Sequence, residues 1–363
     1  MTQEFYSALN RFDWAQFLEQ GAFLRLDGQH SLIWSGPFQI SKELDYSIGY
    51  ADFFAGSVQW TKAPRGPLRV SNADFIQGLR DFVKTQVQTL SKSDFLNPSR
   101  QDFETSFQVI QGKIQREEIE KAVPIVVSAT EKRPAAADQA NWMISLMDQP
   151  QALRVYGFWQ DESGILGATP EILFEQKGGV VRTMALAGTR VVTQAETREE
   201  SARALLSDRK ELHEHQVVVQ DIEKRLETIG WVRRSETRVL ELPHLQHLLT
   251  ELTAEGSQKT PAELIRLLHP TPALGVAPRA YGFQWMKDLS PQEGREKMGG
   301  PLVFSLPNGE SLCLVAIRNI QWSPKGTKVF AGCGVVRESQ LENEWREVHQ
   351  KLDSIFRSIG LVS

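Results

Sequence analysis

The sequence has 363 residues, of which 41% are hydrophobic and 24% are charged, and its formal net charge is −4. These values are typical of a globular protein with a large core, and they argue against a protein that binds nucleic acid or another polyanion. Cys313 and Cys333 are too few for a disulfide framework or a zinc ligand set, and no apolar run could span a bilayer, so we expect a cytoplasmic protein without a membrane partner.

The N-terminal third of the chain alternates between strand-like and helical patterns. Short apolar runs separated by turn residues predict strands over residues 1–75. Apolar residues at helical spacing predict one helix over 72–90 and a second over 103–122. The second helix leads into the apolar run 121–127, which predicts a buried strand.

The middle of the chain combines a loop, a set of strands and a long helix. Small polar residues over 129–141 predict the loop. Several short apolar runs between 154 and 186, separated by glycine, aspartate and serine, predict an antiparallel meander. The longest helical pattern covers 197–228, and Gly230 just beyond it is a natural stop signal.

The last third returns to strands after a short helix. That helix is predicted over 262–268, and the His-Pro-Thr-Pro sequence at 269–272 must end it, because each proline disfavours the helical conformation in the residue before it. Strands are predicted over 302–305, 312–317 and 328–330, with a Pro-Asn-Gly turn joining the first two as a hairpin. Together the patterns predict one α+β domain with large antiparallel sheets.

Two Glu-x-x-Glu pairs, far apart in the sequence, are candidates for a metal site. Glu211 and Glu214 lie within the long helical pattern, and Glu344 and Glu347 lie near the C-terminus. A helix places residues at this spacing on one face. Four converging carboxylates would repel one another unless a divalent cation such as Mg²⁺ lay between them. Two unrelated acidic helix faces would show the same spacing.

Residues near the C-terminus form a candidate anion site. Arg318 offers a fork of donors shaped for a carboxylate. Gly332 and Gly334 lack side chains, so the backbone N–H groups of that turn could approach a bound anion closely. Lys351 follows Glu347 by four residues and would share its helix face. A strand, a glycine turn and an amphipathic helix would show the same pattern without a site.

Seven short motifs that occur in one order along residues 115–360 resemble those of the chorismate-utilising enzymes. This family includes isochorismate synthases, salicylate synthases and the synthase components for anthranilate and aminodeoxychorismate. The motifs are Gly-Ala-Thr-Pro-Glu at 167–171, Leu-Ala-Gly-Thr-Arg at 186–190, His-Glu-His at 213–215, His-Pro-Thr-Pro-Ala at 269–273, Ala-Ile-Arg at 316–318, Ala-Gly-Cys-Gly-Val-Val at 331–336 and Glu-Trp-Arg-Glu at 344–347.

The resemblance implies both a fold and a division of the chain. The fold is a single large α+β domain with two big, mostly antiparallel sheets flanked by helices. Residues 1–110 would be the variable N-terminal part of this domain, and residues 111–363 the chorismate-binding catalytic part. The resemblance also favours a monomer.

The same resemblance implies a Mg²⁺-dependent site for chorismate, a dicarboxylate with a ring hydroxyl. Glu214 and Glu347 would bind the metal directly, with Glu211 and Glu344 behind them through water. The residues that would hold the pyruvyl carboxylate, or lie close to it, are Arg318, Gly332, Gly334 and Lys351. The residues that match the lining of the ring pocket are Gly188, Thr189, His247 and Ala273.

The resemblance also implies catalytic roles for two further residues. Glu171 would be the general acid that protonates the departing ring hydroxyl, which requires a carboxyl kept protonated by its surroundings. Lys121 would be the base toward the attacking water, although Lys113 or Lys132 could be mistaken for it. The aminating synthase components carry glutamine at the position of Lys121 and take ammonia as nucleophile.

Three positions depart from the family pattern. Met298 stands where an aromatic residue usually borders the substrate, Val303 replaces a glycine, and Val276 interrupts the usual Gly-Gly pair. These changes leave the predicted metal and acid residues intact, but they could alter the shape of the pocket.

The closest resemblance is to isochorismate synthases of menaquinone or siderophore biosynthesis. A salicylate synthase, which also eliminates pyruvate, remains an alternative. Two less favoured alternatives are an aminating synthase component that binds a glutaminase and a non-catalytic chorismate-binding protein.

Overall fold

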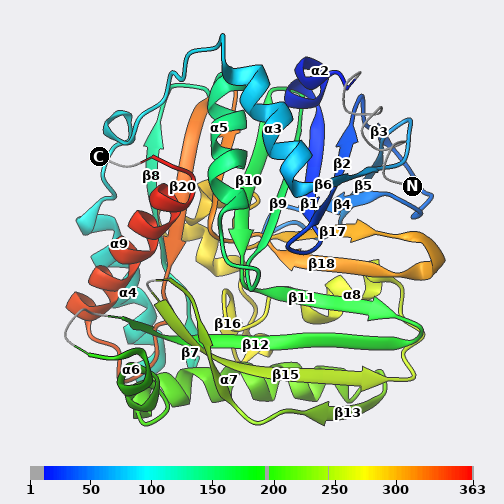
Figure 1. The fold of residues 1–363 in the computed structure, drawn as a ribbon. Coiled ribbons are helices and arrows are strands. Elements are labelled where there is room, and N and C mark those ends of the chain that lie inside the picture. The colour runs from blue at the N-terminus through cyan, green and yellow to red at the C-terminus, as the bar shows by residue number, and fades with distance from the viewer. Residues whose placement is uncertain (1–11, 193–195, 244, 362–363) are drawn as a thin grey trace.

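Two large β-sheets form the framework of the computed structural model, which describes residues 12–192, 196–243 and 245–361 (Figure 1). The predicted α+β class, with two large and mostly antiparallel sheets flanked by helices, is confirmed. A separate two-stranded sheet pairs β7 (Lys121–Ala122) with β16 (Val276–Ala277). Among the described residues we find no helix whose length and apolarity would let it span a bilayer.

The first sheet has eight strands, each antiparallel to its neighbours. In spatial order they are β6 (Leu68–Ser71), β2 (His30–Ser35), β1 (Gly21–Arg25), β9 (Arg154–Gln160), β10 (Ser163–Thr169), β19 (Asn319–Ser323), β20 (Gly326–Gly332) and β8 (Ile125–Thr130).

The second sheet has ten strands. Nine follow the order β13 (Trp231–Arg234), β15 (Leu245–Glu255), β12 (Val180–Val191), β11 (Ile172–Lys177), β18 (Ser311–Val315), β17 (Pro301–Ser305), β4 (Ile48–Tyr50), β5 (Gln59–Lys62) and β3 (Gln39–Ile40), and β14 (Arg238–Glu241) also pairs with β15. The strands predicted in the N-terminal region are therefore divided between the two sheets.

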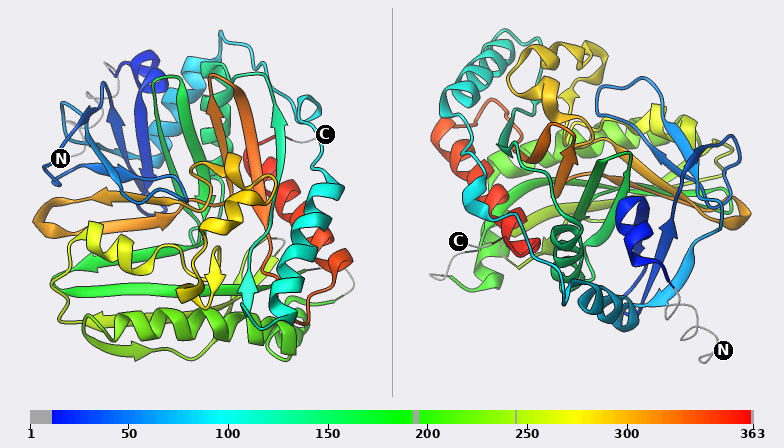
Figure 2. Two further views of the ribbon diagram at one scale, coloured as in Figure 1. Left: turned by 180° about the vertical axis from the view of Figure 1, so that it is seen from behind. Right: turned by 90° about the horizontal axis from the view of Figure 1, so that it is seen from above.

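The helices cover the sheets and the edge where they meet. They are α2 (Trp14–Glu19), α3 (Asn72–Val83), α4 (Arg100–Gln115), α5 (Ala136–Met147), α6 (Arg198–Leu205), α7 (Arg209–Leu226), α8 (Pro261–Leu268) and α9 (Leu341–Ser358). Five short 3₁₀ segments lie at Lys92–Asp94, Arg279–Tyr281, Gln284–Asp288, Gln292–Arg295 and Pro307–Gly309. Figures 1 and 2 show α7 running along the sheet that holds β12 and β15, while α4 and α9 lie side by side at one edge of the molecule.

Burial of apolar side chains against each sheet holds these layers together. The core on the eight-stranded sheet takes residues from α3, α4, α5 and α9, such as Phe75, Phe103, Trp142 and Leu352. The core on the ten-stranded sheet takes residues from α7 and α8. A third cluster, which includes Trp34 and Phe304, lies between strands of the two sheets. Apolar burial of this extent is the main stabilising term in folding.

Several sequence predictions about helices were wrong. The helices predicted over 72–90 and 103–122 end earlier, at Val83 and Gln115. The single helix over 197–228 is two helices: the first ends at Leu205, and the side chain of Asp208 accepts a hydrogen bond from the backbone of Glu211, capping the second. The loop predicted over 129–141 is helical from Ala136 onward, because α5 begins there and continues to Met147. There the buried carboxylate of Asp138 accepts hydrogen bonds from the backbone of Ala135 and Leu90, so a polar residue is satisfied inside a helix.

The meander predicted between 154 and 186 has the right strands but spans two sheets. β9 and β10 pair in the eight-stranded sheet, whereas β11 and β12 pair in the ten-stranded sheet. The chain crosses from one sheet to the other at Pro170 and Glu171. Glu171 therefore lies where the sheets diverge. The hairpin predicted around the Pro-Asn-Gly turn is confirmed by the pairing of β17 with β18.

Candidate active site

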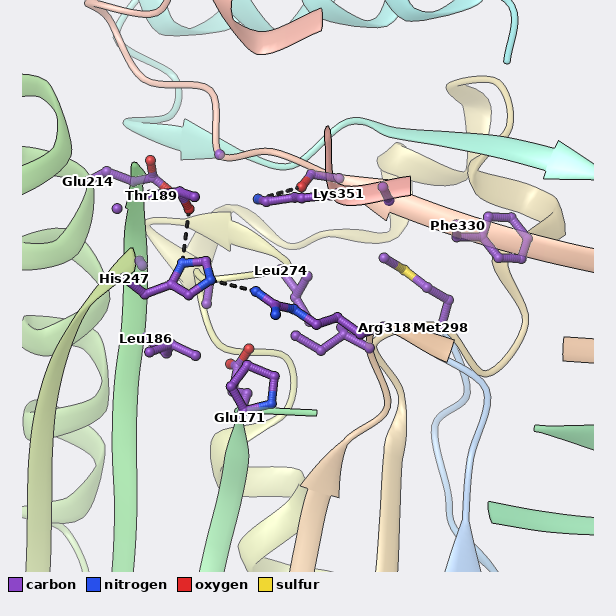
Figure 3. A pocket seen from close by; sticks show the side chains of 18 of the residues that line it. Glu171, Leu186, Thr189, Glu214, His247, Leu274, Met298, Arg318, Phe330 and Lys351 are labelled. Carbon is purple, nitrogen blue, oxygen red and sulfur yellow. Dashed lines mark hydrogen bonds between the residues drawn. The ribbon is translucent and has the colours of Figure 1, made fainter. Parts of the chain in front are cut away.

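A cavity lies where the ends of strands from both sheets meet α9, and Figure 3 shows the side chains that face it. Ten of the fourteen residues that the sequence predicted for a site line this cavity: Glu171, Gly188, Thr189, Glu214, His247, Ala273, Arg318, Gly332, Gly334 and Lys351. The other four, Lys121, Glu211, Glu344 and Glu347, do not line it and are described below. The tertiary structure thus gathers residues that are up to 180 positions apart, from Glu171 to Lys351.

Glu171 is a buried carboxyl at the crossing between the sheets. Glu171 is only 3% exposed, and its backbone N–H donates to Thr169 Oγ1 at 3.1 Å. Burial raises the pKa of Glu171 from 4.5 to about 7, although the positive charges of Lys121, Lys351 and Arg318 oppose this rise. The carboxyl can therefore be protonated near neutral pH, as a general acid must be.

Arg318 projects into the cavity from a strained turn. Its φ angle is +53°, in the left-handed region that a non-glycine residue rarely adopts. The neighbouring backbone is held from two sides, since the Tyr156 hydroxyl donates to Ile317 O at 2.9 Å and the Asn319 amide donates to Ala316 O at 2.6 Å. These bonds fix the direction in which the guanidinium points.

A chain of hydrogen bonds runs from Arg318 through His247 to Thr189 (Figure 3). Arg318 Nη2 lies 2.5 Å from His247 Nε2, and His247 Nδ1 lies 3.1 Å from Thr189 Oγ1. Because guanidinium can only donate, Nε2 accepts and the ring proton lies on Nδ1. Burial, together with the charges of Arg318 and Lys351, lowers the pKa of His247 well below its usual value. The histidine is a neutral ring at neutral pH.

Two glycines have specific steric reasons to be there. Gly188 has a φ of +77° at an irregularity in the β12–β15 pairing, and a side chain there would approach the backbone oxygen of Glu211 at 2.9 Å. A side chain at Gly334 would lie 2.0 Å from Glu214 Oε1. The lack of a side chain at Gly334 therefore leaves room for the Glu214 carboxylate. The sequence predicted that Gly334 binds an anion and did not predict this contact.

The acidic pairs of α7 and α9 lie around a lysine. Lys210 Nζ is 2.9 Å from Glu211 Oε1, 3.0 Å from Glu344 Oε1 and 3.8 Å from Glu214 Oε2. Glu347 is the fourth acidic residue here, and its Oε1 lies 2.6 Å from Lys351 Nζ. We call Glu211, Glu214, Glu344 and Glu347 the carboxylate group. Burial lowers the pKa of Lys210, but the surrounding carboxylates raise it by more, so Lys210 carries its charge here.

The donor chemistry of this carboxylate group fits a hard divalent cation. In the described parts of the chain no three His, Cys, Asp or Glu side chains stand close enough together to form a preassembled metal site. However, Glu344 Oε2 is buried and has no hydrogen-bond partner, which leaves a free carboxylate oxygen in the group. Carboxylate oxygens are the ligands that Mg²⁺ prefers.

Lys121 is completely buried behind the cavity. Its Nζ lies 3.0 Å from Glu214 Oε1 and donates to Pro272 O at 2.8 Å, and the side chain is 0% exposed. The two lysines that could be mistaken for it lie elsewhere: Lys113 pairs with Glu118, and Lys132 is exposed. Of these three lysines, Lys121 alone touches a predicted metal ligand.

The three departures from the family pattern have different consequences for the cavity. Met298 lines it directly. Val303 is fully buried opposite Gly49 in the β4–β17 pair, where a side chain on Gly49 would approach Val303 Cγ1 at 2.6 Å. Val276 pairs with Ala122 and does not line the cavity. Only Met298 alters the wall of the cavity itself.

The sequence reasoning missed Lys210 and the apolar wall of the cavity. The wall includes Leu186, Leu274, Ile317, Phe330 and Ile355. These residues follow ordinary core patterns, so nothing in the sequence distinguishes them. Lys210 precedes Glu211 and stands four residues before Glu214, a spacing that could have revealed it as a partner of the acidic pair.

Comparison with known proteins agrees with the resemblance drawn from the motifs. A family model described as "Chorismate binding enzyme" matches residues 71–360. A protein named "Salicylate biosynthesis isochorismate synthase" from Pseudomonas aeruginosa is 31% identical over 255 residues, which is 66% of this chain and 51% of that protein. "Isochorismate synthase MenF" from Bacillus subtilis is 31% identical over 224 residues, or 60% of this chain and 46% of that protein.

A solved structure supports the fold. MenF, described as the menaquinone-specific isochorismate synthase from Escherichia coli, has a TM-score of 0.76 and 21% identity, and the match covers 96% of this chain and 92% of that one. In sequence, the chain spans about half the length of the curated relatives it matches. The resemblance predicted from the motifs is confirmed, and the chain belongs to the family of chorismate-binding enzymes.

Proposed function

We propose that the protein is an isochorismate synthase, which converts chorismate to isochorismate by adding water and releasing the ring hydroxyl. The observation that carries this proposal is the buried Glu171 carboxyl, with a pKa raised to about 7 by burial, in the same cavity as Arg318 and Glu214. An acid that is protonated at neutral pH beside cationic groups suits the departure of a hydroxyl from a dianion.

The cationic side chains of the cavity suit a dicarboxylate substrate. Arg318 can donate two parallel hydrogen bonds to one carboxylate, and Lys351 lies on the same cavity wall. His247 is neutral and receives a bond from Arg318, so it orients the guanidinium without competing for the substrate's charge. We infer that these residues hold the pyruvyl carboxylate.

We propose that Glu214 and Glu347 hold Mg²⁺ directly, with Glu211 and Glu344 behind them. When bound, Mg²⁺ would neutralise the ring carboxylate and the charge that develops as the hydroxyl departs. Thr189 N–H donates to Glu211 Oε2 at 2.7 Å, and Lys121 contacts Glu214, so the protein positions both carboxylates of α7.

The reaction needs one proton to leave the attacking water and one to reach the departing hydroxyl. We propose that Lys121 accepts the first and Glu171 supplies the second, so that the product is an isomer of the substrate. Lys121 Nζ is held by Glu214 and by Pro272 O, so at least one of these contacts must open before Lys121 can reach the attacking water.

Other products and roles are consistent with parts of the same site. A salicylate synthase would use it and then eliminate pyruvate from isochorismate. An aminating synthase component is disfavoured by Lys121, and a non-catalytic chorismate-binding protein would have to owe its inactivity to Met298. We further propose that the protein acts as a cytoplasmic monomer in menaquinone or siderophore biosynthesis.

The test is to incubate the purified protein with chorismate and to separate the products by chromatography, with and without Mg²⁺ and ammonia. Isochorismate that forms only with Mg²⁺ and does not depend on ammonia supports the proposal. Salicylate with pyruvate would assign the protein to the eliminating enzymes instead. An aminated product, or no product despite bound chorismate, would contradict it.

A further inference from the structure

The ammonium group of Lys210 lies within the carboxylate group that we propose as the Mg²⁺ site. It contacts Glu211 and Glu344 at 2.9 and 3.0 Å and lies 3.8 Å from Glu214. The Lys210 side chain is only 18% exposed, and the Glu344 side chain 2% exposed. Lysine charges are seldom this deeply buried unless opposite charges surround them.

Lys210 does not satisfy all the acidic oxygens around it. Glu344 Oε2 remains buried without a hydrogen-bond partner, which is costly for a carboxylate. Glu214 Oε2 lies at 3.8 Å from Lys210 Nζ, beyond hydrogen-bond distance. The carboxylate group therefore offers more hydrogen-bond acceptors than one ammonium can satisfy.

A second cavity, which we call the outer cavity, lies beside this group and holds about 660 Å³. Its lining includes Lys210, Glu211, Glu344 and Glu347, while Glu214 faces the cavity that contains Glu171 and Arg318. The carboxylate group thus stands between two spaces. Lys210 has room to withdraw into the outer cavity, and a cation could reach the carboxylates from there without crossing the substrate cavity.

The lining of the outer cavity would favour the approach of a cation. Three more acidic residues contribute to it: Glu196, Asp208 and Glu338. Arg190 and Arg346 also line it, and the charge of Arg190 is engaged by Glu196 at 3.0 Å. With Lys210 included, six acidic side chains face three basic ones in this lining. A concentration of one sign of charge at a cavity mouth raises the local concentration of ions of opposite sign.

We propose that Lys210 is a built-in counter-cation that a divalent cation must displace, so that Lys210 weakens Mg²⁺ binding while keeping the metal-free site stable. This inference rests on the proposed function, because it takes the carboxylate group as the Mg²⁺ site. Two cations this close repel each other strongly in a partly buried site. Mg²⁺ can therefore enter only if the ammonium moves away from Glu344 and Glu214.

The test is direct measurement of Mg²⁺ binding by isothermal titration calorimetry, without chorismate, on the full chain. Lys210→Met removes the charge, and we expect its Kd for Mg²⁺ to be lower than that of the unmodified protein by about ten-fold or more. Lys210→Arg keeps a charge and should bind Mg²⁺ no more tightly than the unmodified protein. Lys224→Met, at an exposed position further along α7, is the matched control and should leave the Kd unchanged.

Thermal unfolding gives a second readout that does not depend on catalysis. Without metal, Lys210→Met should unfold at a lower temperature than the unmodified protein, because its carboxylates lack a counter-charge. Mg²⁺ should then raise the Tm of Lys210→Met by more than it raises the Tm of the unmodified protein. If Lys210→Met does not fold without metal, Lys210→Gln, which keeps a hydrogen-bond donor, replaces it in both experiments.

The outcomes separate this inference from the proposed function. Equal or weaker Mg²⁺ binding in the uncharged variants, with isochorismate still formed by the unmodified protein, would overturn the role of Lys210 alone. If neither protein bound Mg²⁺ and no product formed, both proposals would fall. Tighter binding in Lys210→Met but not in Lys210→Arg supports the displacement of Lys210 by the metal.

Discussion

Lys121 Nζ lies 3.0 Å from Glu214 Oε1, so the residue that we propose as the base forms an ion pair with a proposed metal ligand. The side chains are 0% and 9% exposed, and Gly334 leaves the space in which they meet. Removing one member of a buried pair leaves the other charge uncompensated. The two proposed functions, proton transfer and metal binding, are therefore physically connected at this contact.

Replacement of Lys121 should abolish turnover while most of the fold survives. Lys121→Gln keeps a donor for Pro272 O and Glu214 but cannot accept a proton from water, so we expect kcat for isochorismate formation to fall by about 100-fold or more. Circular dichroism would verify folding. Lys132→Gln, at an exposed lysine, is the control and should keep full activity. Near-normal turnover by Lys121→Gln would remove Lys121 from the mechanism.

The pKa of Glu171 predicts a specific dependence of stability on pH. Burial raises this pKa from 4.5 to about 7, so the folded protein binds the proton more tightly than the unfolded chain does. The stabilisation from the protonated carboxyl is complete below pH 4.5 and is lost as the pH rises through about 7. Between pH 5 and 8, Glu171 should lower the free energy of unfolding by roughly 2–3 kcal/mol.

Denaturant unfolding at pH 5 and 8 would check this value. Glu171→Gln cannot titrate, so the loss of stability between the two pH values should be smaller in Glu171→Gln than in the unmodified protein by that amount. Glu19→Gln, at an exposed position, should behave like the unmodified protein. Equal pH dependence in the unmodified protein and Glu171→Gln would show that folding does not raise the pKa of Glu171. Glu171→Gln should also lack turnover, because an amide cannot supply the proton.

Arg318 should control the affinity for the substrate. Arg318→Met removes a charged donor facing the cavity, and we expect KM for chorismate to rise by about 10- to 100-fold. The Kd for Mg²⁺ should change little, because Arg318 contacts His247 rather than the carboxylate group. Arg69→Met, at an exposed arginine on β6, is the control. A normal KM in Arg318→Met would place the substrate's carboxylate elsewhere.

The contact between Gly49 and Val303 should be visible as energetic coupling. Gly49→Ala would bring a methyl group within 2.6 Å of Val303 Cγ1, and we expect a loss of about 1–3 kcal/mol in the free energy of unfolding. The double variant Gly49→Ala/Val303→Ala should lose less than the sum of its single variants, because each change makes room for the other. Gly56→Ala, which meets nothing within 4 Å, is the matched control. Strict additivity would contradict the contact.

Local sequence patterns selected candidate site residues that the structure brings together, but they missed several boundaries of the elements. Glu211, Glu214, Glu344 and Glu347 were identified because helical spacing alone puts each pair on one face. The division of 197–228 into α6 and α7 was missed. Asp208 can either continue a helix or cap a new one, and the helical spacing of apolar residues does not show which of the two occurs. The helix α5 was missed because the partners of Asp138 include residues 48 positions away.

The family motifs, the acidic pairs and the hairpin around the Pro-Asn-Gly turn could be read from the sequence, since each motif, pair or turn involves residues close together in the chain. The three-dimensional fold was needed to show which strands share a sheet, and therefore that Glu171 is buried at the crossing between sheets. The structure also decided that Lys210 lies among the carboxylates and that Lys121 pairs with Glu214. These contacts depend on long-range packing, which brings side chains together whatever their separation in sequence and which no local periodicity encodes.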